Sequence, residues 1–191
     1  MSQVIVCYLR SSSELLEDHV LNRLAAYRAP HSSHNDGAPM VHVELYFPDA
    51  ANRDAGLSAG IHYGGKMFMF PKRFQRNDWV FHAIPASHAQ VAKAKSFCRR
   101  QVGAGFNYAG FYLPRACNVS HSYRVHNSGH KRMSWYCSEL VSYALCHAGI
   151  IDSAVAKLAS EHPNQTYHAI AESCDTYMDS ARSLTSTSIE L

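Results

Sequence analysis

Two segments of this chain carry the residue types that activate a cysteine nucleophile. Cys137 lies three residues before Leu140 on an apolar helical stripe, and residues 41–47 place His42 and Glu44 two positions apart. A neutral imidazole beside a thiol can take its proton. A carboxylate on the same face can orient that imidazole or stabilise its protonated form. These patterns predict Cys137 as a nucleophile, His42 as its base and Glu44 as a third member of the site.

The position of Cys137 supports two interpretations. In the first turn of a helix, unpaired backbone N–H groups and the helix dipole favour the thiolate, and the same N–H groups can stabilise an oxyanion. However, cysteine is among the most frequently buried residue types, and a cysteine on an apolar stripe is usually part of a core. Position alone favours the core interpretation, so the weight rests on the histidine and on the resemblance given below.

The identity of the third member stays open at this level. Period-two alternation directs Val43 and Leu45 into a core and places His42 and Glu44 together on the other face. Ser58 and His62 occupy the corresponding polar face of the next predicted strand, and either can replace Glu44 as the orienting group. The choice depends on strand register, which the sequence does not determine. An exposed polar strand face explains the same pattern equally well.

Other polar and aromatic residues near these segments are interpreted as structural. Glu139 projects from a different side of the helix than Cys137, and its place in the first turn suits the helix dipole. Asn107 and Tyr108 are expected to pack rather than to line a cleft. Residues 67–70 are expected to belong to the core rather than to a lipid-binding stripe.

The cysteines and histidines predict neither a metal site nor a cofactor. None of the six cysteines forms a CxxC pair, which argues against a zinc knuckle or a thioredoxin-like motif. His31 and His34 share a polar loop but have no cysteine or carboxylate partner at ligand spacing.

Strand and helix signals surround these candidate residues. The expected strands are residues 4–9, 41–47, 57–63, 66–70 and 79–84, the last of them ending at Pro85. The expected helix N-caps are Ser11, Ser87, Ser134 and Asn164. This order predicts an α+β domain with an antiparallel sheet over residues 1–180. Residues 181–191 form a Ser/Thr-rich tail that is expected to fray.

Composition supports one globular domain with a real core. The chain has 191 residues, of which 47% are hydrophobic and 17% are charged, so burial is sufficient and wholesale disorder is not expected. The formal net charge of +3 and the lack of a long basic run argue against a nucleic-acid partner.

The sequence also gives an expectation about location. No apolar stretch approaches the roughly 18 residues of a membrane-spanning helix. Met1 is not followed by a basic region and an apolar run of signal-peptide type. An intracellular setting with reduced thiols is therefore expected, and it suits a free cysteine nucleophile. The oligomeric state is left open.

Two motifs in a particular order carry a resemblance to a known superfamily. Residues 135–145 (WYCSELVSYAL) resemble the nucleophile helix of the circularly permuted papain-like enzymes, and residues 42–47 (HVELYF) resemble the histidine strand that precedes it. That superfamily includes NlpC-type peptidases, YiiX-like and LRAT-like proteins, and relatives in large DNA viruses. Residues 163–167 (PNQTY) are similar to a segment that often follows the helix.

The resemblance implies a fold and a class of chemistry. It implies a permuted papain-like fold, in which an antiparallel sheet packs against the nucleophile helix, with Cys137 as nucleophile and His42 as base. The third residue varies in the superfamily, so Glu44 and His62 both remain candidates. The substrate implied is a peptide, an amide or an acyl lipid. The expected activity is a cysteine peptidase or amidase; the alternatives are a thiol-dependent acyltransferase or thioesterase, and a virus–host interaction protein that keeps the fold without turnover.

Overall fold

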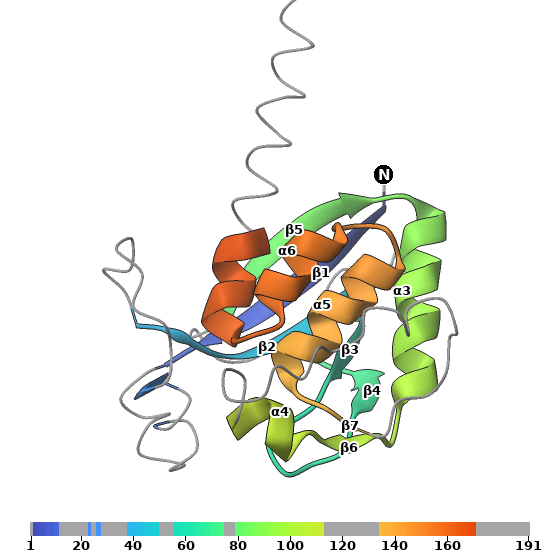
Figure 1. Cartoon of the computed structure of the whole chain (residues 1–191). Helices are drawn as coiled ribbons and strands as arrows, with labels where there is room; N and C mark the ends of the chain where they lie inside the picture. Colours follow the sequence, from blue (N-terminus) through green and yellow to red (C-terminus); the bar gives the residue numbers. More distant parts are fainter. Residues whose placement is uncertain are drawn as a thin grey trace, which may run out of the picture.

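An antiparallel sheet of five strands organises the chain, in the order β4-β3-β2-β1-β5 (Figure 1). The computed structural model describes residues 2–11, 23, 26–27, 38–49, 56–74, 79–112 and 134–170. The strands of the sheet are β1 (Ser2–Arg10), β2 (Met40–Pro48), β3 (Gly56–Gly60), β4 (Phe68–Pro71) and β5 (Trp79–Ala86).

Helices and a short second sheet form the rest of the described part of the chain. The remaining elements are α3 (His88–Gln101), β6 (Gly105–Phe106), α4 (Tyr108–Tyr112), β7 (Ser134–Trp135), α5 (Cys137–His147) and α6 (Ser153–Ala159). Residues 163–170 are also helical. Strands β6 and β7 pair in parallel. The predicted α+β class with an antiparallel sheet is therefore confirmed.

One face of the main sheet forms the apolar core with the helices. Val43, Leu45 and Phe47 of β2 are buried and belong to the same cluster as Leu140 and Val141 of α5. Figure 1 shows α5 and α6 lying across the sheet with α3 beside them. Because alternate residues of a strand point to opposite faces, this packing directs Glu44 and Tyr46 to the other side of the sheet.

That other face of β2 is also covered. Glu44 has no exposed surface and Tyr46 is buried, because Lys72 and Phe74 from the segment after β4 lie against them. The interpretation of this face as an exposed polar surface is therefore wrong. A segment without regular periodicity supplies the cover, so the alternation within β2 could not reveal it.

A bulge changes the direction of β2 next to His42. Leu9 pairs with His42, whereas Arg10 pairs with Met40, so Val41 is an extra residue in the ladder between β1 and β2. A bulge bends its strand and re-aims the neighbouring side chains. The backbone geometry that orients His42 is thus built into the strand itself.

Several predicted element boundaries differ from the structure. Strand β5 continues through Pro85 to Ala86 because it lies at the sheet edge, where proline is tolerated. Helix α5 has Tyr136 as its N-cap, and Ser134 belongs to β7. Asn164 is helical and does not cap its helix; its side chain instead accepts a hydrogen bond from the backbone of Met40 at 3.2 Å.

The remaining predictions about the helices were confirmed in one case and incomplete in another. The cap at Ser87 is confirmed, with Gln90 completing a capping box, whereas α6, capped by Asp152, was not predicted. The helix predicted to follow the Ser11 cap lies largely outside the described residues, and the tail at 181–191 lies wholly outside them. Among the residues described, none of the helices is long and apolar enough to cross a membrane.

Candidate functional site

Cys137 is the first residue of α5, directly after the β6–β7 pair. The backbone N–H of Asn107 donates to the carbonyl of Trp135 at 2.8 Å and fixes the approach to the helix. The N-cap Tyr136 has extended geometry and gives no side-chain hydrogen bond to the first turn. Cys137 is 6% exposed and belongs to the core cluster, yet its side chain also has a polar partner.

That partner is His42. The two side chains interact closely enough for Cys137 to raise the pKa of His42, and Nε2 of the ring contacts Oε1 of Glu44 at 3.2 Å. Burial of the ring, which is 12% exposed, opposes protonation. The hydrogen bonds and charges of Cys137 and Glu44 outweigh it and raise the pKa of His42 to about 9. The structure thus brings the candidate nucleophile and the candidate base together.

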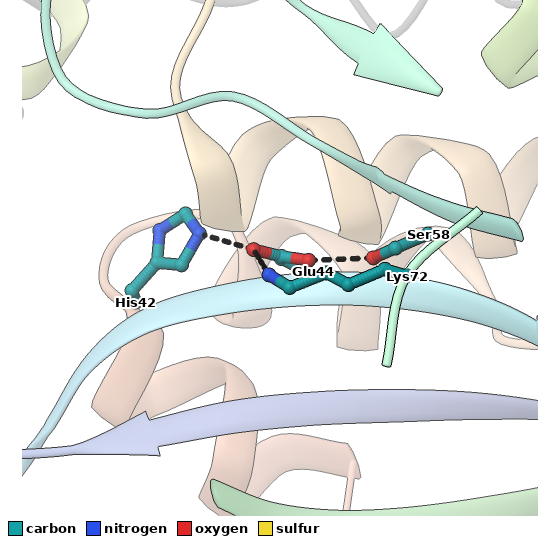
Figure 2. Close-up of polar contacts among 4 residues, drawn as sticks. All are labelled: His42, Glu44, Ser58 and Lys72. Atoms are coloured by element: carbon teal, nitrogen blue, oxygen red, sulfur yellow. Dashed lines mark hydrogen bonds and ion pairs between the residues drawn. The ribbon is translucent and has the colours of Figure 1, made fainter. Parts of the chain in front are cut away.

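Glu44 is held by three groups at once (Figure 2). Oε1 accepts from His42 and from Nζ of Lys72, the latter at 2.6 Å, and Oε2 accepts from the hydroxyl of Ser58 at 2.5 Å. Burial alone raises a carboxyl pKa, but these hydrogen bonds and the charge of His42 lower the pKa of Glu44 to about 2. The carboxylate is therefore ionised and fixed in orientation.

The absence of a side chain at Gly60 leaves room for the Glu44 side chain. Gly60, the last residue of β3, pairs with Phe68 of β4. A Cβ at this position would stand 2.9 Å from Cγ of Glu44 and 3.1 Å from a ring carbon of Phe68. Such distances are too short for an ordinary contact. The glycine thus leaves room for the Glu44 side chain in the position where its carboxylate accepts the hydrogen bond from Ser58.

His62 follows β3 and stacks on the base. Its ring is stacked with that of His42, with centroids 5.0 Å apart and an angle of 26° between the planes, and it is stacked with the ring of Phe68 at the same separation. The edge of the ring is exposed. Loss of water from the stacked faces and the charge of His42 together lower the pKa of His62 to about 4.

The geometry separates the three candidates for the third member. Glu44 hydrogen-bonds the ring of His42 directly, Ser58 bonds the far oxygen of that carboxylate, and His62 contacts the ring through its face. A ring is oriented by a hydrogen bond in its plane, so Glu44 occupies the orienting position and Ser58 supports it.

Lys72 was not among the site residues predicted from the sequence. Besides its contact with Glu44, its ammonium group lies 4.8 Å from the ring centre of Phe74 and 4.7 Å from that of Trp79. These aromatic faces attract a cation and enclose it against the carboxylate. An isolated lysine after a short strand gives no signal of its own, and only the fold reveals this contact.

Glu139 and Asn107 form a second polar contact near Cys137. Glu139 has no exposed surface, and its Oε2 accepts a hydrogen bond from Nδ2 of Asn107 at 3.3 Å. Asn107 also accepts from the backbone N–H of Gly110 at 3.0 Å, which fixes the start of α4. Glu139 therefore has a structural contact, because its hydrogen bond with Asn107 joins the start of α4 to the first turn of α5.

Residues 67–70 were expected to be core, and the structure divides them. Met67 is buried, and Phe68 and Met69 are half-buried. Phe70 is 44% exposed and packs against Phe68 with ring centroids 4.6 Å apart. The expectation is thus wrong for Phe70, which lies at the outer end of a series of rings that begins at His42.

The other described cysteines have environments that disfavour the thiolate. Burial and the charge of Glu44 raise the pKa of Cys7, which pairs with Glu44 across β1 and β2. Burial raises the pKa of Cys98 to about 12. Burial and the charge of Asp152 raise the pKa of Cys146.

His42, Glu44 and His62 are also the described residues whose ligand atoms come closest to a metal-binding arrangement, all within 4.8 Å of one another. Both oxygens of Glu44 are already engaged, one of them by the ammonium of Lys72. A divalent cation would have to displace that ammonium from a buried carboxylate. We therefore assign the three residues no metal-binding role.

Comparison of the chain with protein-family models, with curated proteins and with solved structures gives no match. The function is accordingly argued from the chemistry of the site.

Proposed function

We propose that the protein is a cysteine hydrolase, a peptidase or amidase, in which Cys137 is the nucleophile, His42 the general acid and base, and Glu44 the residue that orients His42. The observation that carries this proposal is the position of the His42 ring. Hydrogen bonding and charge of Cys137 raise the pKa of this ring, and an ionised carboxylate contacts its Nε2. Nucleophilic catalysis by cysteine requires these three groups together.

The reaction follows from these three groups. His42 takes the proton of Cys137, and the thiolate forms a bond to the substrate carbonyl carbon. The bond to the leaving nitrogen then breaks as His42 returns the proton to it, which leaves an acyl-enzyme. Water attacks the acyl carbon while His42 removes a proton, and the sulfur departs with the product acid released. Glu44 keeps the ring oriented and balances its charge while it is protonated.

The first turn of α5 supplies stabilisation for the oxyanion. Its N-cap Tyr136 provides no side-chain acceptor, and the backbone N–H groups at the start of a helix point toward its N-terminus together with the positive end of the dipole. The carbonyl oxygen of a substrate bonded to Cys137 lies next to these donors. The permuted papain-like fold that the sequence resembles has this same combination of helix and histidine strand, and it is part of the proposal.

A second candidate, a thioesterase or acyltransferase for apolar acyl groups, has one observation in its favour. The rings of His42, His62, Phe68 and Phe70 stack in series, with centroids 5.0, 5.0 and 4.6 Å apart, and Phe70 is exposed. An acyl chain can lie along such a series. The chemistry at Cys137 would be the same, with a second acceptor in place of water for the transferase.

The acyl-enzyme gives the direct test of Cys137. Incubation with p-nitrophenyl acetate is expected to release nitrophenolate and to add one acetyl group to Cys137, located by mass spectrometry of the quenched protein. Cys137→Ala abolishes both signals. The matched control is Cys146→Ala, at the other end of α5, which retains both.

Folding must be measured alongside, by urea unfolding of each variant. If Cys137→Ala unfolds at a much lower urea concentration, truncation of a packed core residue explains the loss, and the hydrolase proposal fails. It also fails if acetylation occurs at the same rate on Cys146, or if Cys137→Ala keeps the wild-type release of nitrophenolate.

A further inference from the structure

The Lys72 ammonium occupies an unusual position for a surface-type side chain. It is 19% exposed and lies 2.6 Å from Oε1 of Glu44, the same oxygen that Nε2 of His42 contacts at 3.2 Å. Two nitrogens thus share one carboxylate oxygen. Phe74 and Trp79 enclose the ammonium from the other side, so its position is fixed by contacts on several sides.

This arrangement has a consequence for the base. A buried carboxylate with no other cation would hold the proton on an adjacent imidazole strongly, and a base that cannot release its proton cannot act as the acid in the same cycle. A lysine at the shared oxygen offsets part of that negative charge. Since water screens buried groups poorly, the effect of one unit charge a few ångströms away is large.

We propose that Lys72 is a positioning residue of the site: it fixes the Glu44 carboxylate for its hydrogen bond to His42 and, through its charge, limits how tightly His42 holds a proton. This inference rests on the proposed function, because the role that it gives Lys72 serves catalysis by His42. The effect of Lys72 on His42 can nevertheless be measured without any catalytic activity. It assigns a role to a residue outside both sequence motifs.

Charged and titratable groups approach His42 from several elements. Cys137 approaches from α5, and Glu44 is on the same strand. His62 stacks from the end of β3, and Cys7 lies on β1 across from Glu44. Lys72 is the one ammonium group among these side chains. Its removal therefore shifts the His42 midpoint in one direction, upward.

The test is the titration of His42 in the full-length protein, followed by NMR with ¹³C-labelled histidine. The His42→Gln spectrum identifies the signal. Lys72→Gln keeps a hydrogen-bond donor but removes the charge, and it is expected to raise the His42 midpoint by about one pH unit. Lys72→Arg keeps the charge and is expected to leave the midpoint within about 0.3 unit of wild type, since a full unit of charge is retained.

Lys72→Met is a second neutral variant, used if Lys72→Gln does not fold, and the same upward shift is expected. An unchanged midpoint in the neutral variants overturns the inference. So does an equal shift in Lys72→Arg, which would show that packing and not charge is responsible. The titration can be measured whether or not the protein turns over a substrate. If the protein is inactive on p-nitrophenyl acetate but the shift occurs, the hydrolase proposal is contradicted and the role of Lys72 at His42 is still supported.

Discussion

The two faces of β2 are both buried, but they are buried in different ways. On one face Val43, Leu45 and Phe47 pack into the apolar cluster beneath the helices. On the other, Glu44 is ionised and held by hydrogen bonds from His42, Lys72 and Ser58. One strand therefore supports the core with one set of alternate residues and a charged network with the other.

The difference indicates where function lies. Burial of apolar side chains stabilises a fold directly, at about 25 cal/mol per Å². Burial of charges carries a desolvation penalty that ion pairing at best offsets, so apolar residues of similar volume would often serve stability as well or better. The charged face is thus poorly explained by stability alone, and the catalytic role that we propose would account for the position of Glu44 and its partners.

The largest expected effect comes from removal of Glu44. Glu44→Ala leaves Lys72 and His42 without their shared acceptor, and breaking a buried pair in this way typically costs about 3–5 kcal/mol. We expect a loss of this size in the free energy of unfolding in urea. Acetylation of Cys137 by p-nitrophenyl acetate should fall in the same variant under conditions where it remains folded.

Leu45→Ala is the matched change on the apolar face, one residue along the strand. It is expected to lower stability by about 2–5 kcal/mol while the folded fraction keeps a near wild-type acetylation rate. Equal losses of reactivity in both variants would contradict the division of β2 into a core face and a catalytic face.

The charged face of β2 also predicts that the free energy of unfolding decreases both at acidic and at alkaline pH. The pKa of Glu44 falls from its ordinary 4.5 to about 2, so its contribution is present above 4.5 and is lost as the pH falls toward 2. The pKa of His42 rises from 6.5 to about 9, so its contribution is complete below 6.5 and is lost as the pH rises through 9.

Urea unfolding across pH measures both limits. His42→Gln is expected to flatten the alkaline decline, and Glu44→Gln the acidic one. The lowered pKa of His62 adds a loss of its own on the acidic side, so His62→Gln serves as the control there. An alkaline decline that persists unchanged in His42→Gln would show that the histidine is not responsible for it.

A smaller effect is expected from Ser58→Ala. The hydroxyl donates one hydrogen bond to a carboxylate that keeps two other partners, and such a bond to a charged group contributes about 1.5–3 kcal/mol. The loss of stability should fall at the lower end of this range. A loss as large as that of Glu44→Ala would place Ser58 at the centre of the network instead.

The sequence predicted much of β2 but not what surrounds it. Alternation of apolar and polar residues correctly gave the strand and its two faces, since it reflects a local period. It could not show that Lys72 and Phe74 cover the polar face, because they come from an irregular segment. The choice among Glu44, Ser58 and His62 needed the register of β2 and β3, which is set by tertiary pairing and not by either strand alone.

The start of α5 illustrates the same limit. The apolar stripe from Cys137 through Leu140 predicted the helix, and Ser134 was a reasonable cap by residue type. Pairing of β7 with β6 instead places Ser134 in a strand, so the helix begins at Cys137 itself. This tertiary effect puts the thiol at the first helical position, where its contact with His42 forms.

The dependence of Cys137 reactivity on His42 tests the central claim most directly. The measurement is the rate of acetylation of Cys137 by p-nitrophenyl acetate at pH 7 in wild type and in His42→Gln, with folding verified by urea unfolding. Loss of a positioned general base lowers such a rate by about 10²–10⁴-fold, and we expect a decrease of at least 10²-fold. A rate in folded His42→Gln within about twofold of wild type would contradict the account, since a general base contributes far more than that.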